Sequence, residues 1–399
     1  MKRFLQFIVI FLCFMLVAYG EPIAFPNRKV ASPPKIEKKA KDKKKAEIPY
    51  GKLPAKGFAS LIGKNTEELT KHYGEPIEIQ ETALGYSWWI LGEDEKDYLQ
   101  VAVKNQKIAS IFVLGQELPV APFKIGMSIG EISNITTIFS NFDFEKKGQK
   151  YKIELTEKDM SYRPLVAFDN ESFAILHLNE RTGKIIGVRY LDKSVLLRLM
   201  PYELHEGELV DEVINQKADW ALVNSDSERQ FQTILGILRK RDKHLPYVYS
   251  KELIESTQKA VNTISNHPEK IFDQKNRLEE WQAHENSYKF NDPLELTTKE
   301  QDKLLESGDL DPKKIHSVFY SPAYDVPFLL MSWYSDILSQ DQLTHVTDKE
   351  VGVAFSKDVV LFVILDEKVS TKDSSSASSN EQNIKQELSQ ERDKEAGNL

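Results

Sequence analysis

The sequence of 399 residues has a single cysteine, Cys13, and this residue lies in an apolar run at the N-terminus. If that run is removed as an export signal, the remaining chain has no thiol. It can then form neither a disulfide bond nor a thiolate metal site. Exported proteins without disulfides are common in Gram-positive bacteria, so this absence favours a bacterial source. Cys13 follows Leu12 rather than a small residue, which argues against a lipoprotein signal.

Long apolar runs are also scarce. One extends from Phe4 to Val17, follows Lys2-Arg3, and precedes the small-x-small sequence Ala18-Tyr19-Gly20. This order is typical of a signal peptide, predicted over residues 1–20. The run is shorter than the roughly 20 residues that a membrane span prefers. Cleavage after Gly20 is therefore the favoured interpretation, and an uncleaved anchor is the alternative. No second segment is long enough to span a membrane.

Several catalytic and binding patterns are missing. The sequence has no G-x-S-x-G, no H-E-x-x-H, no cysteine nucleophile and no Gly-rich loop placed to hold a phosphate. The formal net charge of −8 argues against nucleic-acid binding by the folded part. We therefore predict no catalytic residue, no metal and no cofactor.

Two segments have little apolar content and are predicted to be disordered. Residues 21–57 form a basic linker centred on a run of lysines, and residues 369–399 form a polar tail. The basic linker is interpreted as a spacer, or as a contact with anionic lipid headgroups or wall polymers. Each Lys or Arg near an anionic membrane contributes about 1 kcal/mol.

The first folded block, residues 58–204, contains an internal repeat. One copy begins at Leu61-Ile62-Gly63 and the other at Lys124-Ile125-Gly126. Each continues with a polar N-cap candidate (Asn65 or Thr66, and Ser128) and a short amphipathic helix. Each copy then has two strands with period-two patterning and turn residues between them. These predicted hairpins cover 98–103 with 108–113, and 173–178 with 184–190. Each copy is thus predicted to be a helix followed by an antiparallel meander.

The second block, residues 210–368, begins with helical patterns and ends with strands. Apolar residues at i, i+3, i+4 and i+7 predict helices around 231–238 and 253–264, and a third is expected over 328–338. The runs 351–355 and 359–365 predict a closing hairpin with its turn at Ser356-Lys357-Asp358. The chain is therefore predicted to have an α+β fold.

The first block resembles the bacterial CAP-associated N-terminal domain, a family with no established activity to transfer. The matching segments are Leu61-Ile62-Gly63, Tyr73-Gly74-Glu75-Pro76, Gly85 to Ile90, Tyr98 to Val101, Pro122 to Met127, and Thr182-Gly183-Lys184 through Tyr190. That domain usually precedes a CAP domain, the α-β-α sandwich of cysteine-rich secretory and pathogenesis-related proteins.

The second block resembles a degenerate CAP domain. His267-Pro268 with Ile271-Phe272-Asp273, then His284-Glu285-Asn286, Trp333 and Glu350 to Ala354 follow the order of the CAP motifs. CAP domains place two histidines and two acidic groups in one cleft, where some members bind a divalent metal. The resemblance puts His267 and Glu285 at the first histidine and the first acid. Asp325 is the nearest candidate for the second acid, and Ser339 stands where the second histidine belongs.

These four residues form the candidate cleft, and each also has a structural interpretation. His267 is alternatively a cap or a packed loop residue, and Glu285 a solvated carboxylate. A site with one imidazole is a poor transition-metal site. We therefore expect a non-catalytic extracellular or cell-envelope protein that binds a protein, peptide, glycan or lipid. The alternatives are a metal-dependent CAP-type hydrolase and a structural component of sporulation or envelope assembly.

Overall fold

The computed structural model describes residues 50–208, 214–284, 290, 293–344 and 350–365, which belong to one structural unit. The predicted signal peptide, most of the predicted basic linker and the polar tail lie outside the described residues. Among those described, no helix has the length and apolar character needed to cross a bilayer. The fold is α+β, as predicted.

The first block is built on one large mixed sheet in which both predicted hairpins are confirmed. The turn residues Asn105 and Gln106, and Gly183 in the second hairpin, have positive φ angles, which tight hairpin turns require. In spatial order the strands are β1 (Lys52–Leu53), β8 (Leu165–Phe168), β9 (Phe173–Asn179), β10 (Lys184–Leu191), β5 (Lys107–Val113), β4 (Leu99–Lys104), β3 (Ser87–Leu91) and β2 (Glu78–Gln80).

The internal repeat is visible in the hydrogen bonds of this sheet. Gly63 N–H donates to Ile108 O, and Gly126 N–H donates to Ile185 O, both at 2.8 Å. The two hairpins meet where β10 pairs antiparallel with β5, and both carry a register shift at the equivalent position. Two copies are therefore related by an approximate two-fold axis between β5 and β10.

Short helices and a small second sheet complete the first block. Ser128 caps its helix through a capping box with Glu131, as its sequence position suggested. The helices are α2 (Phe58–Leu61), α3 (Thr66–Tyr73), α4 (Ile129–Ser133), α5 (Glu157–Tyr162) and α6 (Lys193–Leu199), and the small sheet has β6 (Asn141–Lys146), β7 (Gln149–Glu154) and β11 (Glu203–Glu206).

The fold begins earlier than the sequence suggested. Residues 52–53, which we assigned to the basic linker, form β1 and pair in parallel with β8. Ala55 N–H donates to the Asp169 carboxylate at 2.9 Å, and Leu53 packs against the core. A strand of two residues has no readable periodicity, so the predicted boundary at residue 57 was too late.

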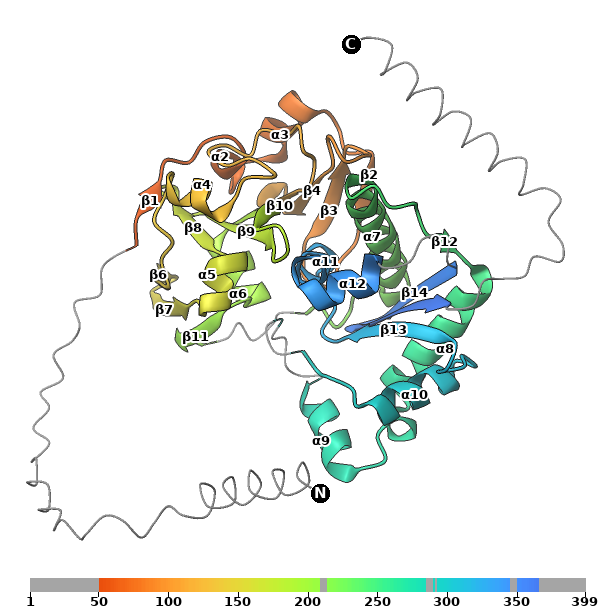
Figure 1. The fold of residues 1–399 in the computed structure, drawn as a ribbon. Helices are drawn as coiled ribbons and strands as arrows, with labels where there is room; N and C mark the ends of the chain where they lie inside the picture. The colour runs from red at the N-terminus through yellow and green to blue at the C-terminus, as the bar shows by residue number, and fades with distance from the viewer. Residues whose placement is uncertain (1–49, 209–213, 285–289, 291–292, 345–349, 366–399) are drawn as a thin grey trace, which may run out of the picture. The chain divides into compact units, whose positions relative to one another are not determined.

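The second block is a three-layer α-β-α sandwich, as the CAP resemblance implied. Alternate residues of the closing hairpin face opposite layers. Val353 and Phe362 pack with Phe231, whereas Ala354 and Leu361 pack in the core that contains Val261. Figure 1 shows α11 and α12 on one side of this sheet and α8 and α10 on the other. The sheet contains β12 (Val248–Tyr249), β14 (Glu350–Ser356), β15 (Val359–Leu365) and β13 (Ile315–Tyr320); the helices are α7 (Trp220–Arg241), α8 (Lys251–Asn266), the 3-10 turn η1 (Pro268–Lys270), α9 (Lys275–His284), α10 (Thr298–Ser307), α11 (Val326–Ser335) and α12 (Ile337–Thr344).

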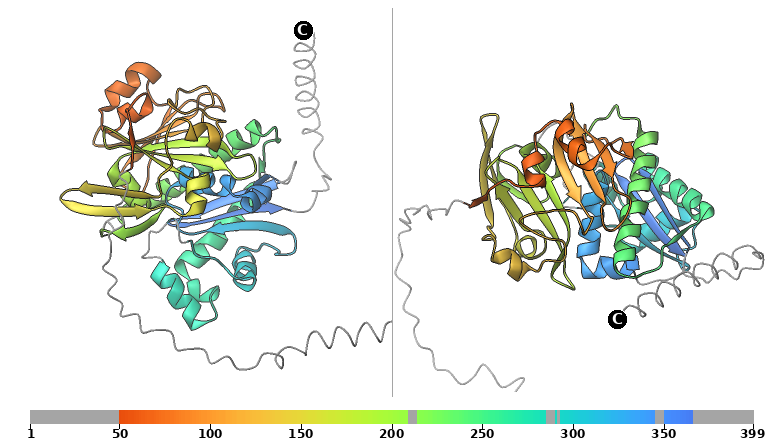
Figure 2. Two further views of the ribbon diagram at one scale, coloured as in Figure 1. Left: turned by 60° about the vertical axis from the view of Figure 1, so that its left-hand side comes forward. Right: turned by 90° about the horizontal axis from the view of Figure 1, so that it is seen from above.

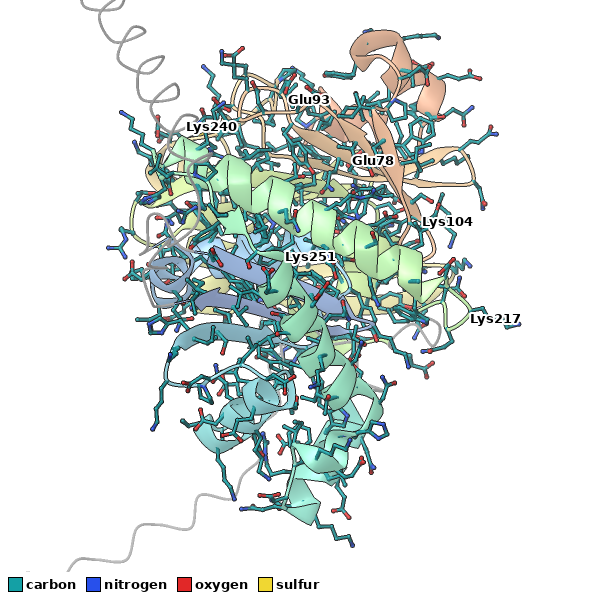
Figure 3. The ribbon with its side chains drawn as sticks, turned by 90° about the vertical axis from the view of Figure 1, so that its right-hand side faces the viewer. Glu78, Glu93, Lys104, Lys217, Lys240 and Lys251 are labelled. Carbon is teal, nitrogen blue, oxygen red and sulfur yellow. The ribbon has the colours of Figure 1, made fainter. Side chains whose placement is uncertain are left out.

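Helix α7 links the two blocks. In Figure 2 this helix, drawn in green, runs along their junction, and Figure 3 shows it crossing one face from near Lys217 to Lys240. Lys240 Nζ lies 2.8 Å from a Glu95 carboxylate oxygen, and Arg229 pairs with Glu78 at 3.0 Å. Arg241 donates to the carbonyl oxygen of Ile186 at 2.8 Å. One hydrophobic core also contains residues of both blocks.

Candidate functional site

His267 does not join Asp325 and Ser339, the other described members of the predicted cleft. It ends α8, its side chain is 58% exposed, and its ring lies 3.4 Å from the neighbouring Glu269 carboxylate. Helix α8 packs on the face of the sheet that includes Ala354, whereas the helix that begins after Asp325 packs on the face that includes Val353. The sheet therefore separates His267 from Asp325 and Ser339.

Asp325 is fully buried in an ion pair rather than open to a cleft. Its carboxylate is the N-cap of α11 and accepts from Phe328 N–H at 2.9 Å. Arg189 of β10 reaches it at 3.0 Å, and Tyr86 OH donates to it at 2.9 Å. The Arg189 guanidinium also lies over the ring of Trp88, 4.4 Å from the ring centroid. Asp325 thus joins the blocks and holds its helix in place.

Ser339 lies in α12 and is bonded to Asp336, the residue that precedes this helix, and Glu285 lies outside the described residues. The Ser339 N–H and hydroxyl both donate to the Asp336 carboxylate at 3.0 Å. Partial burial raises the pKa of Asp336, but these bonds and the nearby Lys158 charge lower it below its usual value overall. Ser339 itself does not line the cavity described next, whereas Asp336 does.

A cavity of about 330 Å³ lies where the first block meets α11 and β13. Its first-block wall includes Lys158, Asp159, Arg163, His177 and Glu180. Its second-block wall includes Phe290, Tyr320, Ser332, Ser335 and Asp336. The volume is at the lower end of the range of about 300–1,000 Å³ that is usual for small-molecule pockets. None of the described members of the predicted cleft lines it.

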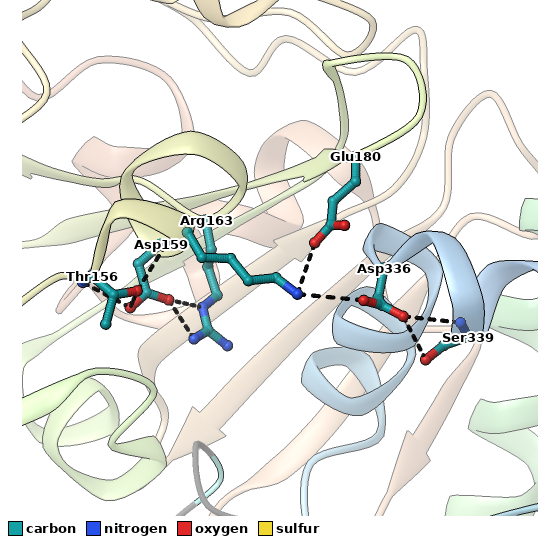
Figure 4. A network of polar contacts seen from close by, with 7 residues as sticks. Thr156, Asp159, Arg163, Glu180, Asp336 and Ser339 are labelled. Atoms are coloured by element: carbon teal, nitrogen blue, oxygen red, sulfur yellow. Dashed lines mark hydrogen bonds and ion pairs between the residues drawn. The ribbon is translucent and has the colours of Figure 1, made fainter. Parts of the chain in front are cut away.

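Lys158 bridges the two walls of the cavity. Its ammonium lies 3.0 Å from a Glu180 oxygen and 3.4 Å from an Asp336 oxygen. Figure 4 shows Glu180 and Asp336 reaching toward each other from different elements, with Ser339 next to Asp336 and bonded to it. Partial burial lowers the pKa of Lys158, but the two carboxylates raise it above its usual value overall. The charges at this position are therefore paired within the protein.

Hydrogen bonds hold the Arg163 guanidinium in one position at the cavity wall. Two of its nitrogens contact one Asp159 oxygen, at 3.1 and 2.6 Å, and it donates to Pro201 O at 2.9 Å. Asp159 is in turn fixed by a capping box with Thr156 at the start of α5. Figure 4 shows this chain from Thr156 through Asp159 to Arg163.

Three uncharged polar side chains, His177, Ser332 and Ser335, line the cavity. His177 is 2% exposed, and its ring packs edge-on against the ring of Phe328. The Ser332 and Ser335 hydroxyl oxygens are buried and have no hydrogen-bond partner among the described residues. Burial, together with the Arg163 and Arg189 charges, holds the pKa of His177 well below its usual value, so the ring is neutral. Buried polar groups normally have partners, so the two serine hydroxyls point to an occupant of the cavity.

His177 makes the stability of the protein depend on pH. Its folded pKa is depressed, so below about pH 6.5 the unfolded chain binds a proton that the folded chain does not. The contribution of His177 to the free energy of unfolding is complete above that pH. As the pH falls from there toward the folded pKa, this contribution decreases by about 1.4 kcal/mol per pH unit. We expect His177→Gln to weaken the fall in unfolding free energy between pH 6.5 and 5, measured by urea denaturation.

The control for this measurement is His72→Gln, at an exposed residue of α3. This variant should keep the pH dependence of the parent protein. Identical slopes for His177→Gln and the parent would mean that His177 takes up a proton in the folded state.

Sequence reasoning missed this cavity because its walls are distant in sequence. His177 lies inside a strand of mostly apolar residues, which gave no reason to consider it a site residue. Lys158 and Glu180 look like ordinary surface charges in the sequence. The one available signal was His177 itself, an imidazole at an inward-facing position of β9 that shares a face with Phe173 and Ile175.

Comparison with known proteins identifies the first block. Residues 62–202 match the CAP-associated N-terminal family. The Bacillus subtilis membrane protein YlbC is 31% identical over 188 residues, which are 47% of this chain and 54% of that protein. The chain thus aligns with about half the length of this curated relative.

Two solved structures share the fold. An extracellular protein containing an SCP domain from Bacillus anthracis has a TM-score of 0.60 at 20% identity, covering 81% of this chain and 99% of the other. A cysteine-rich secretory protein from Staphylococcus aureus has a TM-score of 0.62 at 20% identity, covering 80% and 95%. The chain therefore shares the fold of these two structures, and its residues 62–202 match the CAP-associated N-terminal family.

Proposed function

We propose that this CAP-type protein is a non-catalytic binding protein that acts outside the cytoplasm and captures a small polar ligand in the cavity between its two blocks. The observation that carries the proposal is the pair of buried, unpartnered hydroxyls of Ser332 and Ser335 on the wall of that cavity, which the buried His177 ring also lines. A ligand would supply the missing partners and would contact both blocks at once.

The location outside the cytoplasm is supported by the sequence at the N-terminus and by the absence of cysteine after Cys13. One structural relative is described as extracellular, and the curated relative as a membrane protein. Both descriptions fit a protein that works at the cell envelope. The basic segment within 21–57 is part of the same proposal, as a contact with anionic envelope polymers or lipids.

A metal-dependent hydrolase has less support. The described residues contain no group of three or more His, Cys, Asp or Glu side chains arranged to hold a metal. Of the residues assigned to the cleft, Asp325 is committed to Arg189 and His267 lies beyond the sheet. We expect the purified protein to carry no stoichiometric zinc, measured by elemental analysis. Stoichiometric zinc that is lost in His267→Ala would overturn the non-catalytic proposal.

A ligand screen tests the binding proposal directly. Fragments of mixed chemistry should give saturation-transfer NMR signals with the parent protein, and Ser335→Trp should remove them because the indole occupies the cavity. Ser335→Leu is the second variant if the larger side chain prevents folding. Signals that persist in the folded, occluded variants would place binding elsewhere and contradict the proposal.

A further inference from the structure

Among the described residues, the charges around the cavity leave no free cation for an anionic ligand. Lys158 is held by two carboxylates, and Arg163 by Asp159 and a carbonyl oxygen. The lining carries two cationic side chains, Lys158 and Arg163, and four carboxylates, Asp159, Glu180, Glu203 and Asp336, so its net charge is 2 − 4 = −2 with His177 neutral. A phosphate or carboxylate would meet net repulsion here, because like charges in a partly buried site are poorly screened.

A cationic ligand would have to compete with the protein itself. The position between Glu180 and Asp336 already holds the Lys158 ammonium. A free amine would need to displace a tethered one, and an intramolecular partner has a high effective concentration. The paired charges therefore favour a ligand that carries no net charge.

The uncharged polar side chains of the cavity wall have a distinctive hydrogen-bonding character. A serine hydroxyl both donates and accepts, and a neutral imidazole has one donor and one acceptor nitrogen. Ser332, Ser335 and His177 therefore match ligand groups that also donate and accept, which is the property of alcohol hydroxyls. A ligand with several hydroxyls at fixed spacing satisfies them together.

Aromatic side chains supply the remaining surface. Tyr162, Phe290 and Tyr320 line the cavity, and Phe290 is 2% exposed. Tyr320 OH donates to Phe290 O at 2.9 Å, which holds the two residues together. Burial raises the pKa of Tyr320 to about 12, so its hydroxyl stays protonated. The wall thus combines ring surface with hydroxyl and imidazole groups, a mixture suited to a ring that has both C–H faces and hydroxyl edges.

We propose that the cavity binds a neutral saccharide of one or two pyranose rings, held by Ser335, Ser332 and His177. This inference rests on the proposed function, since it names the ligand class for the same cavity. A volume of about 330 Å³ accommodates a small sugar and excludes a folded partner. The saccharide would be a free sugar or the end of a longer glycan, and both present the same hydroxyls.

The test compares probes of matched size and different charge by saturation-transfer NMR and calorimetry. The neutral probes are N-acetylglucosamine, its β-1,4-linked disaccharide and cellobiose. The anionic probe is glucuronic acid, the cationic probe is glucosamine, and a non-sugar neutral probe is the dipeptide amide glycyl-glycinamide with a blocked amine. We expect binding of at least one neutral sugar, with no detectable binding of glucuronic acid at the same concentration.

Two serine variants assign the binding to the cavity. Ser335→Ala should lower the affinity for the sugar about three- to tenfold, which is the usual effect of one lost hydrogen bond. Ser133→Ala, at an exposed residue of α4 outside the cavity, is the matched control and should leave the affinity unchanged. Ser335→Trp should abolish binding, and Ser335→Leu replaces it if that variant does not fold.

The outcomes separate the inference from the proposed function. If only the dipeptide amide or the amine binds, and Ser335→Trp removes that binding, the cavity is a ligand site but the saccharide assignment is wrong. If no probe of any charge binds and the occluded variants are as stable as the parent, the cavity holds water only and both proposals fail. Preferential binding of glucuronic acid would also overturn the inference.

Discussion

Replacing Arg189 by methionine is expected to destabilise the protein by about 3–5 kcal/mol, because it leaves the Asp325 carboxylate buried and unpaired. Both side chains are almost fully inaccessible, 1% and 0% exposed, and their closest atoms are 3.0 Å apart. Tyr86 and Phe328 N–H would remain as donors to Asp325, but neither carries a charge. The free energy of unfolding, measured by urea denaturation at pH 7, gives the effect.

Arg181→Met is the matched control. Arg181 pairs with Asp341, also across the two blocks, but these side chains are 52% and 57% exposed. An exposed pair contributes about 0–1 kcal/mol, so this variant should unfold close to the parent protein. Similar losses for Arg181→Met and Arg189→Met would show that pairing between the blocks matters while burial does not.

Replacing Gly352 by alanine should cost about 2–3 kcal/mol. A Cβ atom at this position would lie 2.7 Å from the backbone carbon of Leu253 and 2.8 Å from its oxygen. Helix α8 would therefore have to move away from β14, and overpacking of this kind is destabilising. The measurement is again the free energy of unfolding, with circular dichroism as a check on folding.

Gly236→Ala is the control, and we expect it to change the stability in the opposite direction to Gly352→Ala. Gly236 lies within α7, and a Cβ there would meet no atom within 4 Å. Alanine is the better helix former, so this change should stabilise the protein by about 0.5–1 kcal/mol. Equal effects of the two substitutions would contradict the close approach of α8 to β14. This approach is also the physical reason for glycine in the Val351-Gly352-Val353 segment.

The elements that were predicted well are those with local signals. The hairpin 98–113 alternates apolar and polar residues about a turn at Asn105, and α8 has apolar residues at helical spacing. Strand β13 was not predicted, because its residues after Ile315 are all partly exposed or exposed and give no clear alternation. Helix α10 was also missed, although Thr297 and Glu300 form a capping box that the sequence displays.

The candidate site was harder to predict than the fold. Matching motifs in order along the chain assigned His267 and Ser339 to one cleft, but motif order does not specify which face of a sheet a helix covers. The cavity depends on contacts such as that of the Asn179 amide with Tyr334 O at 3.0 Å, which joins β9 to α11. Contacts separated by more than a hundred residues leave no periodic signal in either segment.

The approximate two-fold axis of the first block pairs each position of one copy with an equivalent position of the other. The register of the paired strands makes Phe112 of the first copy equivalent to Arg189 of the second, and Ala102 equivalent to His177. The first copy thus has apolar residues at the two positions where the second has the guanidinium that anchors Asp325 and the imidazole that lines the cavity. Two equivalent surfaces of one symmetric sheet are therefore used differently, and at these two positions only the second copy contributes polar groups to the junction with the second block.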